Sequence, residues 1–398
     1  MPAFPTLSDA PLDGRRVLVR VDLNVPIKGG VIGDDTRIRA TLPTLTELLE
    51  RGCTLVLASH LGRPKGPDDT ARLGPVAARL AELLGREVRY LATDGPADPA
   101  QAEFVAAAPA GSVTLLENTR FDRRETKNDP ELARVLAGYA DAFVNDAFGA
   151  AHRAHASTEG VARLLPSAAG RLLERELTVL GGLLEAPERP FVVVLGGAKV
   201  SDKIAVIERL LEVADTLIVG GAMAYTFVKA QGGRVGDSLV EDDRLELARE
   251  LLAKAAARKV PLVLPVDSVC AAEIKAGEAV SVHPSNAIPD GLKGLDAGPK
   301  AIAEFKDALA GAATVLWNGP LGVFEVPPFD VATRAIAEAV AASGSMSVVG
   351  GGDSVAAITK AGLADRIEHV STGGGASLEF LEGQTLPGVA ALGAVAWA

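Results

Sequence analysis

The sequence alternates, from one end to the other, between short runs of β-type residues and longer stretches with helical periodicity. This alternation is typical of parallel α/β architecture, in which a helix connects each strand to the next. A chain of 398 residues is too long for one compact core and suits two domains. The expected strands are 17–21, 55–58, 87–91, 113–116 and 142–145 in the first half, and 191–195, 216–219, 261–264, 314–317, 347–349 and 368–370 in the second. The sequence therefore predicts two parallel sheets of comparable size.

A stretch bracketed by prolines, residues 166–190, separates the two groups of strands. Leu172, Leu173, Leu177 and Leu180 form an apolar stripe at helical spacing. One interpretation is a helix that joins the two domains and lets them move as rigid bodies about its ends. The same pattern fits an ordinary packing helix of one domain equally well.

In the first half, charged side chains follow the ends of the expected strands. Ligands of open α/β sheets bind at the carboxyl ends of the strands, so these side chains are candidates for one shared site. Arginine or histidine follows four strand ends, and guanidinium groups hold small, multiply charged anions by paired hydrogen bonds. The residues are Asp22, Asn24, Arg37, His60, Arg63, Glu117, Asn118, Arg120, His152, Arg153 and His155.

In the second half, glycine follows the strand ends instead. Glycine turns that open onto helices present backbone N–H groups to a phosphate with little side-chain charge, although each single pair also fits a plain tight turn. Asp353 lies in such a turn and is a sensible Mg²⁺ ligand, because magnesium usually takes one carboxylate together with phosphate oxygens and water. The glycine segments are 196–197, 220–221, 318–320, 350–354 and 372–375.

The segment FVVVLGGAKVSDKI, residues 191–204, combines an apolar strand, a glycine turn and the start of a helical pattern. Lys199 and Lys203 are four residues apart, so a helix would place both ammonium groups on one face of its first turns. Cations at a helix N-terminus oppose the helix dipole, which indicates an anion bound by the turn and both lysines. A solvated lysine pair on an ordinary surface explains the spacing equally well.

The formal net charge of −11 argues against a nucleic-acid partner and against an anionic membrane surface. No apolar run reaches membrane-spanning length, and the first residues lack a signal-peptide pattern. Cys53 and Cys270 lie far apart beside apolar runs, as buried thiols of a reducing compartment do. We therefore expect a cytoplasmic protein with small-molecule partners.

Several common motifs are absent from the sequence. It has no Gly-Lys pair and hence no Walker A loop, and it has neither a G-x-G-x-x-G nor a G-x-S-x-G spacing. The missing glycine fingerprint argues against a nicotinamide dehydrogenase. His152 and His155 are three residues apart without a nearby carboxylate, which favours an anion-binding or structural role over a metal site.

Taken together, the motifs resemble those of the phosphoglycerate kinase family, in family order across nearly the whole chain. The N-terminal signatures are RVDLNVP (20–26), SHLGRP (59–64), ENTRF (117–121) and DAFGAAHRAHAS (146–157). The C-terminal ones are GGAKVSDKI (196–204), WNGPLGVFE (317–325), GGGDS (350–354) and STGGGASLEFLEG (371–383). Ser354 stands where the family more often has threonine, and it keeps the hydroxyl group.

The resemblance implies an α/β fold with two Rossmann-like parallel-sheet domains, a hinge helix between them and a C-terminal segment that returns to the N-terminal domain. The expected boundaries are 1–166 for the N-terminal domain, 167–186 for the hinge helix, 187–377 for the nucleotide domain and 378–398 for the returning segment. Asp22, Asn24, Arg37, His60, Arg63, Arg120 and Arg153 would hold 3-phosphoglycerate. Lys199, Lys203, Gly220, Gly221, Gly294, Leu295, Asn318, Glu325, Gly351, Gly352, Asp353 and Ser354 would surround ADP or ATP, with Asp353 on Mg²⁺.

The reaction that the resemblance implies is reversible transfer of the acyl phosphate of 1,3-bisphosphoglycerate to MgADP, with hinge-bending closure of a monomer. The acceptor carboxylate in the reverse direction is already ionised at neutral pH, so no general base is needed. Catalysis would rest on positioning and charge stabilisation by Arg37, Lys199 and Lys203 and by backbone N–H groups around Gly373 and Gly374. The competing class is a two-lobed protein that binds a phosphorylated ligand without chemistry.

Overall fold

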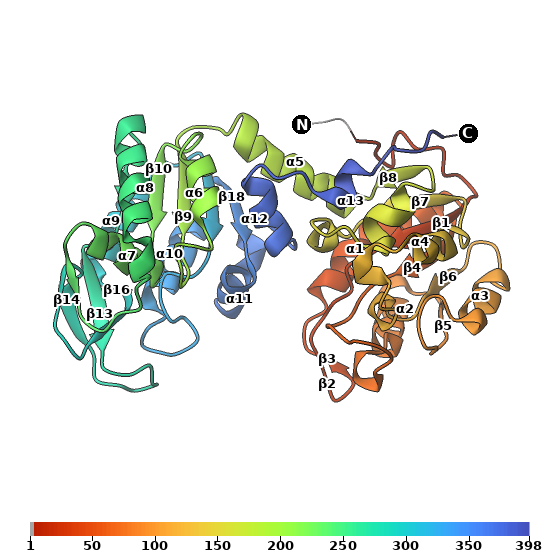
Figure 1. The fold of residues 1–398 in the computed structure, drawn as a ribbon, viewed down its shortest axis with the longest axis horizontal. Coiled ribbons are helices and arrows are strands. Elements are labelled where there is room, and N and C mark those ends of the chain that lie inside the picture. The colour runs from red at the N-terminus through yellow and green to blue at the C-terminus, as the bar shows by residue number, and fades with distance from the viewer. Residues whose placement is uncertain (1–3, 398) are drawn as a thin grey trace. The chain divides into compact units, whose positions relative to one another are not determined.

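The computed structural model describes residues 4–397, which divide into two compact units. The first unit takes the chain as far as Thr178 and again from Gln384, and the second runs over Val179–Gly383. In each unit a central sheet is flanked by helices (Figure 1). No helix within the described residues is both long and apolar enough to cross a membrane.

The central sheet of the first unit has six parallel strands in the order β5-β6-β4-β1-β7-β8. All five strands expected in the first half are present. The strands are β1 (Arg16–Arg20), β4 (Thr54–Ala58), β5 (Val88–Tyr90), β6 (Val113–Leu115), β7 (Ala142–Asn145) and β8 (Ser167–Ala169), with a hairpin of β2 (Ile27–Lys28) and β3 (Val31–Ile32). The helices are α1 (Thr36–Glu50), α2 (Gly74–Leu84), α3 (Pro99–Ala106), α4 (Pro130–Ala137) and α13 (Pro387–Ala390).

The core of the first unit forms where α1 and α2 cover the sheet. Every residue of β4 is buried, as expected for a strand that is covered on both faces. Ile38, Leu45 and Leu48 recur on one side of α1 and belong to the same apolar cluster as Val17 of β1. This packing fixes the start of α1, and therefore Arg37, beside the end of the central strand.

The central sheet of the second unit has the order β12-β10-β9-β17-β18-β19, again with all strands parallel. Numbered along the chain within the sheet, this is 3-2-1-4-5-6, the Rossmann order. The strands are β9 (Phe191–Leu195), β10 (Thr216–Val219), β12 (Leu262–Val263), β17 (Thr314–Asn318), β18 (Met346–Gly350) and β19 (His369–Val370). The helices are α6 (Ile204–Leu210), α7 (Met223–Ala230), α8 (Leu245–Arg258), α9 (Pro299–Leu309), α10 (Val331–Ala342), α11 (Gly352–Lys360) and α12 (Gly375–Leu381).

Two small sheets of the second unit were not expected from the sequence. One is an antiparallel sheet of β13 (Asp267–Ala271), β14 (Ser281–Pro284) and β16 (Lys293–Ala297). The other pairs β11 (Arg234–Val235) with β15 (Ala287–Ile288). Their sequences mix polar and apolar residues over short runs, so they lack the continuous apolar pattern that identified the central strands.

The helix between the two groups of strands, α5 (Arg171–Glu185), contains the division between the units, which falls after Thr178. It is shorter than the expected 167–186, because 167–169 form the edge strand β8. The expected return of the C-terminal segment is confirmed, and Asn145 donates a hydrogen bond of 2.9 Å to the carbonyl oxygen of Gly388. The return begins at Gln384, not 378, because α12 belongs to the second unit.

Candidate active site

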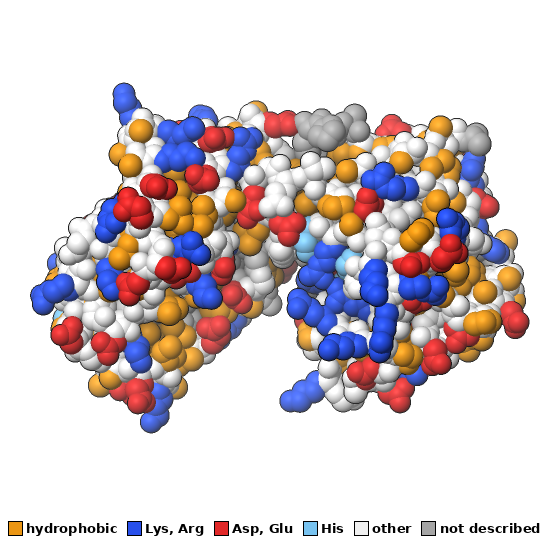
Figure 2. All heavy atoms as spheres, in the orientation of Figure 1, with side chains coloured by type: hydrophobic (Ala, Val, Ile, Leu, Met, Phe, Trp, Pro, Cys, Tyr) orange, Lys and Arg blue, Asp and Glu red, His pale blue; other side chains and the backbone are white. Residues whose placement is uncertain are grey.

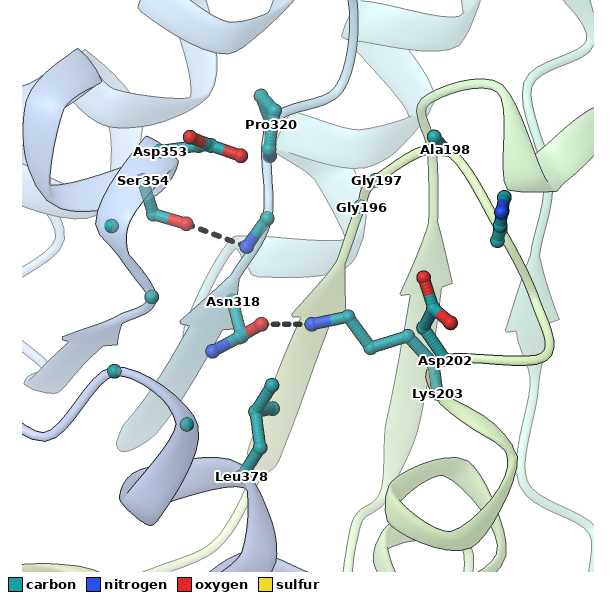
Figure 3. Close-up of a pocket in the computed structure, with 16 residues that line it drawn as sticks. Gly196, Gly197, Ala198, Asp202, Lys203, Asn318, Pro320, Asp353, Ser354 and Leu378 are labelled. Atoms are coloured by element: carbon teal, nitrogen blue, oxygen red, sulfur yellow. Dashed lines mark hydrogen bonds between the residues drawn. The ribbon is translucent and has the colours of Figure 1, made fainter. Parts of the chain in front are cut away.

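The second unit has a cavity of about 410 Å³ at the carboxyl ends of β9, β17 and β18 (Figure 3). Strands β9 and β17 are neighbours in the sheet, and the chain leaves them toward opposite edges. Ligands of open α/β sheets bind at such a switch point. The cavity is lined by Gly196, Gly197, Ala198, Lys199, Asp202, Lys203, Asn318, Gly319, Pro320, Gly351, Gly352, Asp353, Ser354, Gly374, Gly375 and Leu378.

Close backbone packing explains the glycines at this edge of the sheet. A Cβ atom on Gly196 would lie 2.0 Å from the carbonyl oxygen of Pro320, so the turn after β9 tolerates no side chain there. Gly351, with a φ of 91°, is the N-cap of α11, and Gly374 is the N-cap of α12. Two helix N-termini therefore border the cavity without side chains in front of their backbone N–H groups, an arrangement that binds phosphate.

The prediction that Lys199 and Lys203 lie on one face of a helix was wrong. Helix α6 begins at Ile204, so Lys203 is its N-cap and Lys199 lies in the preceding loop. Lys203 is buried with 8% exposure, whereas Lys199 is exposed. Both lysines nevertheless line the cavity, because the loop carries them to the same edge of the sheet.

Lys203 contacts Asn318 across the cavity. Its Nζ donates a hydrogen bond to Oδ1 of Asn318, which lies at the end of β17 (Figure 3). Burial lowers the pKa of Lys203 to about 8, although the carboxylates of Asp202, Asp353 and Glu382 oppose this shift. Within residues 4–397, Nδ2 of Asn318 is buried without a hydrogen-bond partner. The site thus combines an incompletely compensated cation with an unused amide donor, and an anion would satisfy both.

Asp353 and Ser354 follow the glycine turn after β18. Asp353 lies in the first turn of α11, lines the cavity and is exposed. Ser354 is fully buried, and its Oγ accepts a hydrogen bond of 2.5 Å from the backbone N–H of Gly319. Ser354 thus fixes the turn after β17, and Asp353, like Asp202, adds a carboxylate to the cavity lining.

The remaining predicted residues of this half lie outside the cavity lining. Gly221 packs behind the turn, since a Cβ atom on it would lie 2.6 Å from the Gly197 carbonyl oxygen. A Cβ atom on Gly294 would lie 2.2 Å from the Tyr225 hydroxyl, and Leu295 belongs to an apolar cluster with Phe329. The full set outside the lining is Gly220, Gly221, Gly294, Leu295, Glu325 and Gly373.

In the first unit, the expected cationic residues lie together. Figure 2 shows Lys and Arg side chains gathered around histidine on this unit, on the right of the view. Arg37 Nη1 donates to Asp22 Oδ2 at 2.9 Å, and Asn24 Oδ1 accepts from the Gly62 N–H at 2.8 Å. These contacts join the ends of β1 and β4 to α1.

Arg120 is the most constrained of these cations, with 8% exposure. Its Nη1 donates to the carbonyl oxygen of Gly62 at 2.8 Å, and its Nε is buried without a partner in the described part of the chain. Burial, followed by the charges of Arg153, Arg20 and Arg63, lowers the pKa of Arg120. Like charges held this close indicate that an anion completes the site.

Three further residues of this unit, which were not among the expected site residues, are Arg20, Glu125 and Ser157. Arg20 is 1% exposed, and its Nε donates to Ser157 Oγ at 2.8 Å. Ser157 in turn donates to the buried carboxylate of Glu125. Arg20 begins one of the motifs and Ser157 ends another, which was a signal, but no local pattern distinguishes a buried arginine from an exposed one.

A cavity bordered by glycine turns at the switch point of one sheet, together with a cluster of arginines at the strand ends of the other, defines an α/β protein suited to phosphorylated ligands, as phosphotransferases are. A family model described as phosphoglycerate kinase matches residues 7–384. The phosphoglycerate kinase of Moorella thermoacetica is 57% identical over 97% of this chain and 98% of its own length. That of Thermus thermophilus is 58% identical over 97% and 99%. The solved phosphoglycerate kinase structure from Coxiella burnetii has a TM-score of 0.89 at 42% identity and covers 98% of each chain.

This chain belongs to the phosphoglycerate kinase family. Members of the family catalyse reversible phosphoryl transfer between 1,3-bisphosphoglycerate and ADP in glycolysis, so the chain is an enzyme of the kinase class. The family resemblance of the motifs and the predicted fold class are confirmed. The interpretations as a ligand-binding protein without chemistry and as a nicotinamide dehydrogenase are therefore not retained.

Proposed function

We propose that the two anion sites divide the substrates of this reaction, with the nucleotide in the cavity of the second unit and the phosphoglycerate on the cationic cluster of the first. The observation that carries this proposal is the cavity at the β9–β17 switch point. Its lining combines several glycine turns with buried Lys203 and with the Asn318 side chain, whose Nδ2 has no hydrogen-bond partner within the described residues. Such a site fits a chain of phosphate groups.

In the nucleotide half, Lys203 and Asn318 bind phosphate oxygens, and Lys199 contacts the phosphoryl group in transfer. The exposed Lys199 has the freedom to follow that group, whereas Lys203 is held by burial and by its hydrogen bond. Backbone N–H groups supply the other donors. We assign to this half also Gly220, Gly221, Gly351, Gly352, Ser354, Gly373 and Gly374, and to the nucleoside end Gly294, Leu295 and Glu325.

Asp353 is the residue that we expect to hold Mg²⁺. Within residues 4–397, no group of three His, Cys, Asp or Glu side chains could hold a metal ion by itself. Of the two exposed carboxylates in the cavity lining, Asp202 and Asp353, Asp353 lies in the first turn of α11 beside the glycine turn, as fits an ion that takes most of its ligands from phosphate and water. When bound, the ion would neutralise charge on the phosphate oxygens.

In the acceptor half, Asp22, Asn24, Arg37, His60, Arg63, Arg120 and Arg153 hold the phosphoglycerate. The Arg37–Asp22 ion pair keeps the guanidinium in place, and Arg120 has a buried Nε that no described protein group satisfies. The acceptor carboxylate is ionised at neutral pH, so these residues need to position it and offset its charge but not deprotonate it. Because the half-sites belong to different units, we further propose that the units close about α5 before transfer.

A coupled assay tests the function directly. ATP consumption by the purified chain should depend on both 3-phosphoglycerate and Mg²⁺. Tight binding of 3-phosphoglycerate without any turnover of ATP would contradict the proposal.

Two further expectations remain proposals. We propose that the chain acts as a monomer, since each half-site is built from side chains of this one chain. We also propose a cytoplasmic location, because Cys53 and Cys270 are buried free thiols in different units and suit a reducing compartment. Analytical ultracentrifugation and cell fractionation test these two points.

A further inference from the structure

Arg20, at the end of β1, has all three nitrogens of its guanidinium group in contact with other groups of the protein. Its Nε donates to Ser157 Oγ at 2.8 Å, its Nη1 to the carbonyl oxygen of Val21 at 2.5 Å, and its Nη2 lies 3.1 Å from His60 Nδ1. The Ser157 hydroxyl and backbone N–H both donate to the Glu125 carboxylate, at 2.5 Å and 3.0 Å. A buried cation and a buried anion are thus linked through one serine, directly behind a histidine of the acceptor half.

The contact with Arg20 decides where the proton of His60 sits. A guanidinium group donates hydrogen bonds and never accepts them, so His60 Nδ1 must be the acceptor. An imidazole that accepts at Nδ1 is neutral and carries its proton on Nε2. An imidazolium ring would bring two N–H groups face to face at this distance.

The surroundings of His60 agree with a neutral ring. Its charged neighbours are Asp22 and Arg20 from the end of β1, Arg37 from α1, and Arg120 from the 3-10 turn Thr119–Phe121. Burial, opposed by Asp22 and reinforced by the three arginines, lowers the pKa of His60 to about 3. Within residues 4–397, Nε2 makes no hydrogen bond and is not among the buried unpartnered atoms, so it is accessible to a ligand.

A second histidine of the same unit, His152, accepts a hydrogen bond from arginine at the other ring nitrogen, Nε2. Arg153 Nε donates to His152 Nε2 at 3.0 Å, so the proton of a neutral His152 lies on Nδ1. That Nδ1 is buried. The lone pair on His152 Nε2 therefore accepts from Arg153, whereas the Nε2–H of His60 remains available as a donor.

We propose that Arg20 is a positioning residue that holds His60 as a neutral imidazole with its proton on Nε2, so that His60 meets the anionic substrate as an oriented hydrogen-bond donor and not as a cation. The positive charge of the acceptor half then comes from arginine alone. The contact between His60 and substrate rests on the proposed function, but the position of the proton does not.

The first test is nitrogen NMR of the full chain with ¹⁵N-labelled histidine at pH 7. The His60 signals, assigned by their loss in His60→Asn, should show an unprotonated Nδ1 and a protonated Nε2 without added ligand. His152 should show the reverse pattern and serves as the internal control. An imidazolium His60, or a His60 with its proton on Nδ1, would overturn the proposal.

The second test removes Arg20 without leaving a buried charge behind. Arg20→Met alone removes the cation that compensates the buried charge of Glu125 and endangers folding, so the informative variant is Arg20→Met with Glu125→Gln. The control is Glu125→Gln alone, which keeps Arg20 beside His60. In the double variant, but not in the control, we expect a mixture of His60 tautomers and a KM for 3-phosphoglycerate that rises about tenfold with kcat changed by less than about threefold.

The outcomes separate the possible errors. A pure Nε2–H tautomer in the double variant would overturn the proposal, even with a raised KM, because Arg20 would then act through its charge alone. An unchanged KM with mixed tautomers would overturn the link between the tautomer and substrate binding. If the wild-type chain failed to turn over ATP, the proposed function would fall, whereas the NMR result would still decide the state of His60.

Discussion

Lys203 donates a hydrogen bond to Asn318, and this contact joins two segments that are more than a hundred residues apart in sequence. The two side chains come from the N-cap of α6 and the last residue of β17, and both are buried. The contact holds an ammonium group in the cavity of the second unit, where burial lowers its pKa. Binding of an anion should therefore be linked to protonation of Lys203.

MgADP binding should take up protons near pH 8 to 9. The pKa of Lys203 is lowered to about 8 in the free protein, and phosphate beside the ammonium should raise it, so the bound form holds more protons in this range. Affinity should then fall as the pH rises through 8. Calorimetry in buffers of different ionisation enthalpy measures the uptake. It should disappear in Lys203→Met, and uptake that persisted in this variant would have another source.

Arg37→Ala should lower kcat by orders of magnitude while MgADP affinity stays within a few-fold. Arg37 forms an ion pair with Asp22 in the first unit, and its proposed role is on the phosphoryl group in transfer. The matched control is Arg39→Ala, since Arg39 lies two residues from Arg37 on α1, pairs with Asp35 four residues before it and is mostly exposed. Steady-state kinetics and ADP titration compare the two variants. Near wild-type turnover of Arg37→Ala would remove this residue from the mechanism.

Asp353→Asn should weaken binding of MgADP by about tenfold or more and leave binding of metal-free ADP nearly unchanged. The substitution removes the carboxylate proposed to hold Mg²⁺ but keeps the first turn of α11. Asp365→Asn, in the short turn Ala364–Arg366, serves as the control because it lies outside the cavity lining. Titration with and without Mg²⁺ gives the comparison. Equal weakening in both titrations would indicate a role in phosphate binding and not in metal binding.

Gly196→Ala should destabilise the protein by ~2 kcal/mol or more, because the added Cβ would lie 2.0 Å from a backbone carbonyl oxygen that cannot move aside cheaply. The control is Gly182→Ala, inside helix α5, where a Cβ meets nothing within 4 Å. That variant should be stabilised by up to ~1 kcal/mol, since alanine is the better helix former. Denaturant unfolding measures both. Equal stability of the two variants would contradict the close packing of the β9 and β17 turns.

The expected central strands could be found because buried parallel strands are continuous apolar runs. Strand β8, with the sequence SAA, and the small antiparallel sheet could not be found, since short runs of small or mixed residues carry little signal of their own. The prediction of a shared helical face for Lys199 and Lys203 was wrong for a related reason. Ser201, in the loop before α6, donates its backbone N–H and its hydroxyl to the Glu241 carboxylate, and this contact with a distant segment holds the loop outside the helix, which begins at Ile204.

By itself, the sequence determined the fold class, the family and the residue types at each strand end, because apolar runs and turn glycines are local signals. Only the tertiary structure decided which strand ends are neighbours, since the order of strands in a sheet depends on contacts between distant segments. That order places Asn318 beside Lys203 and Arg20 behind His60. Burial then sets their chemistry, because removing a cation from water lowers its pKa or forces it to find a partner. The sequence lists these side chains, and the packing around them determines which carry charge and which carry an oriented proton.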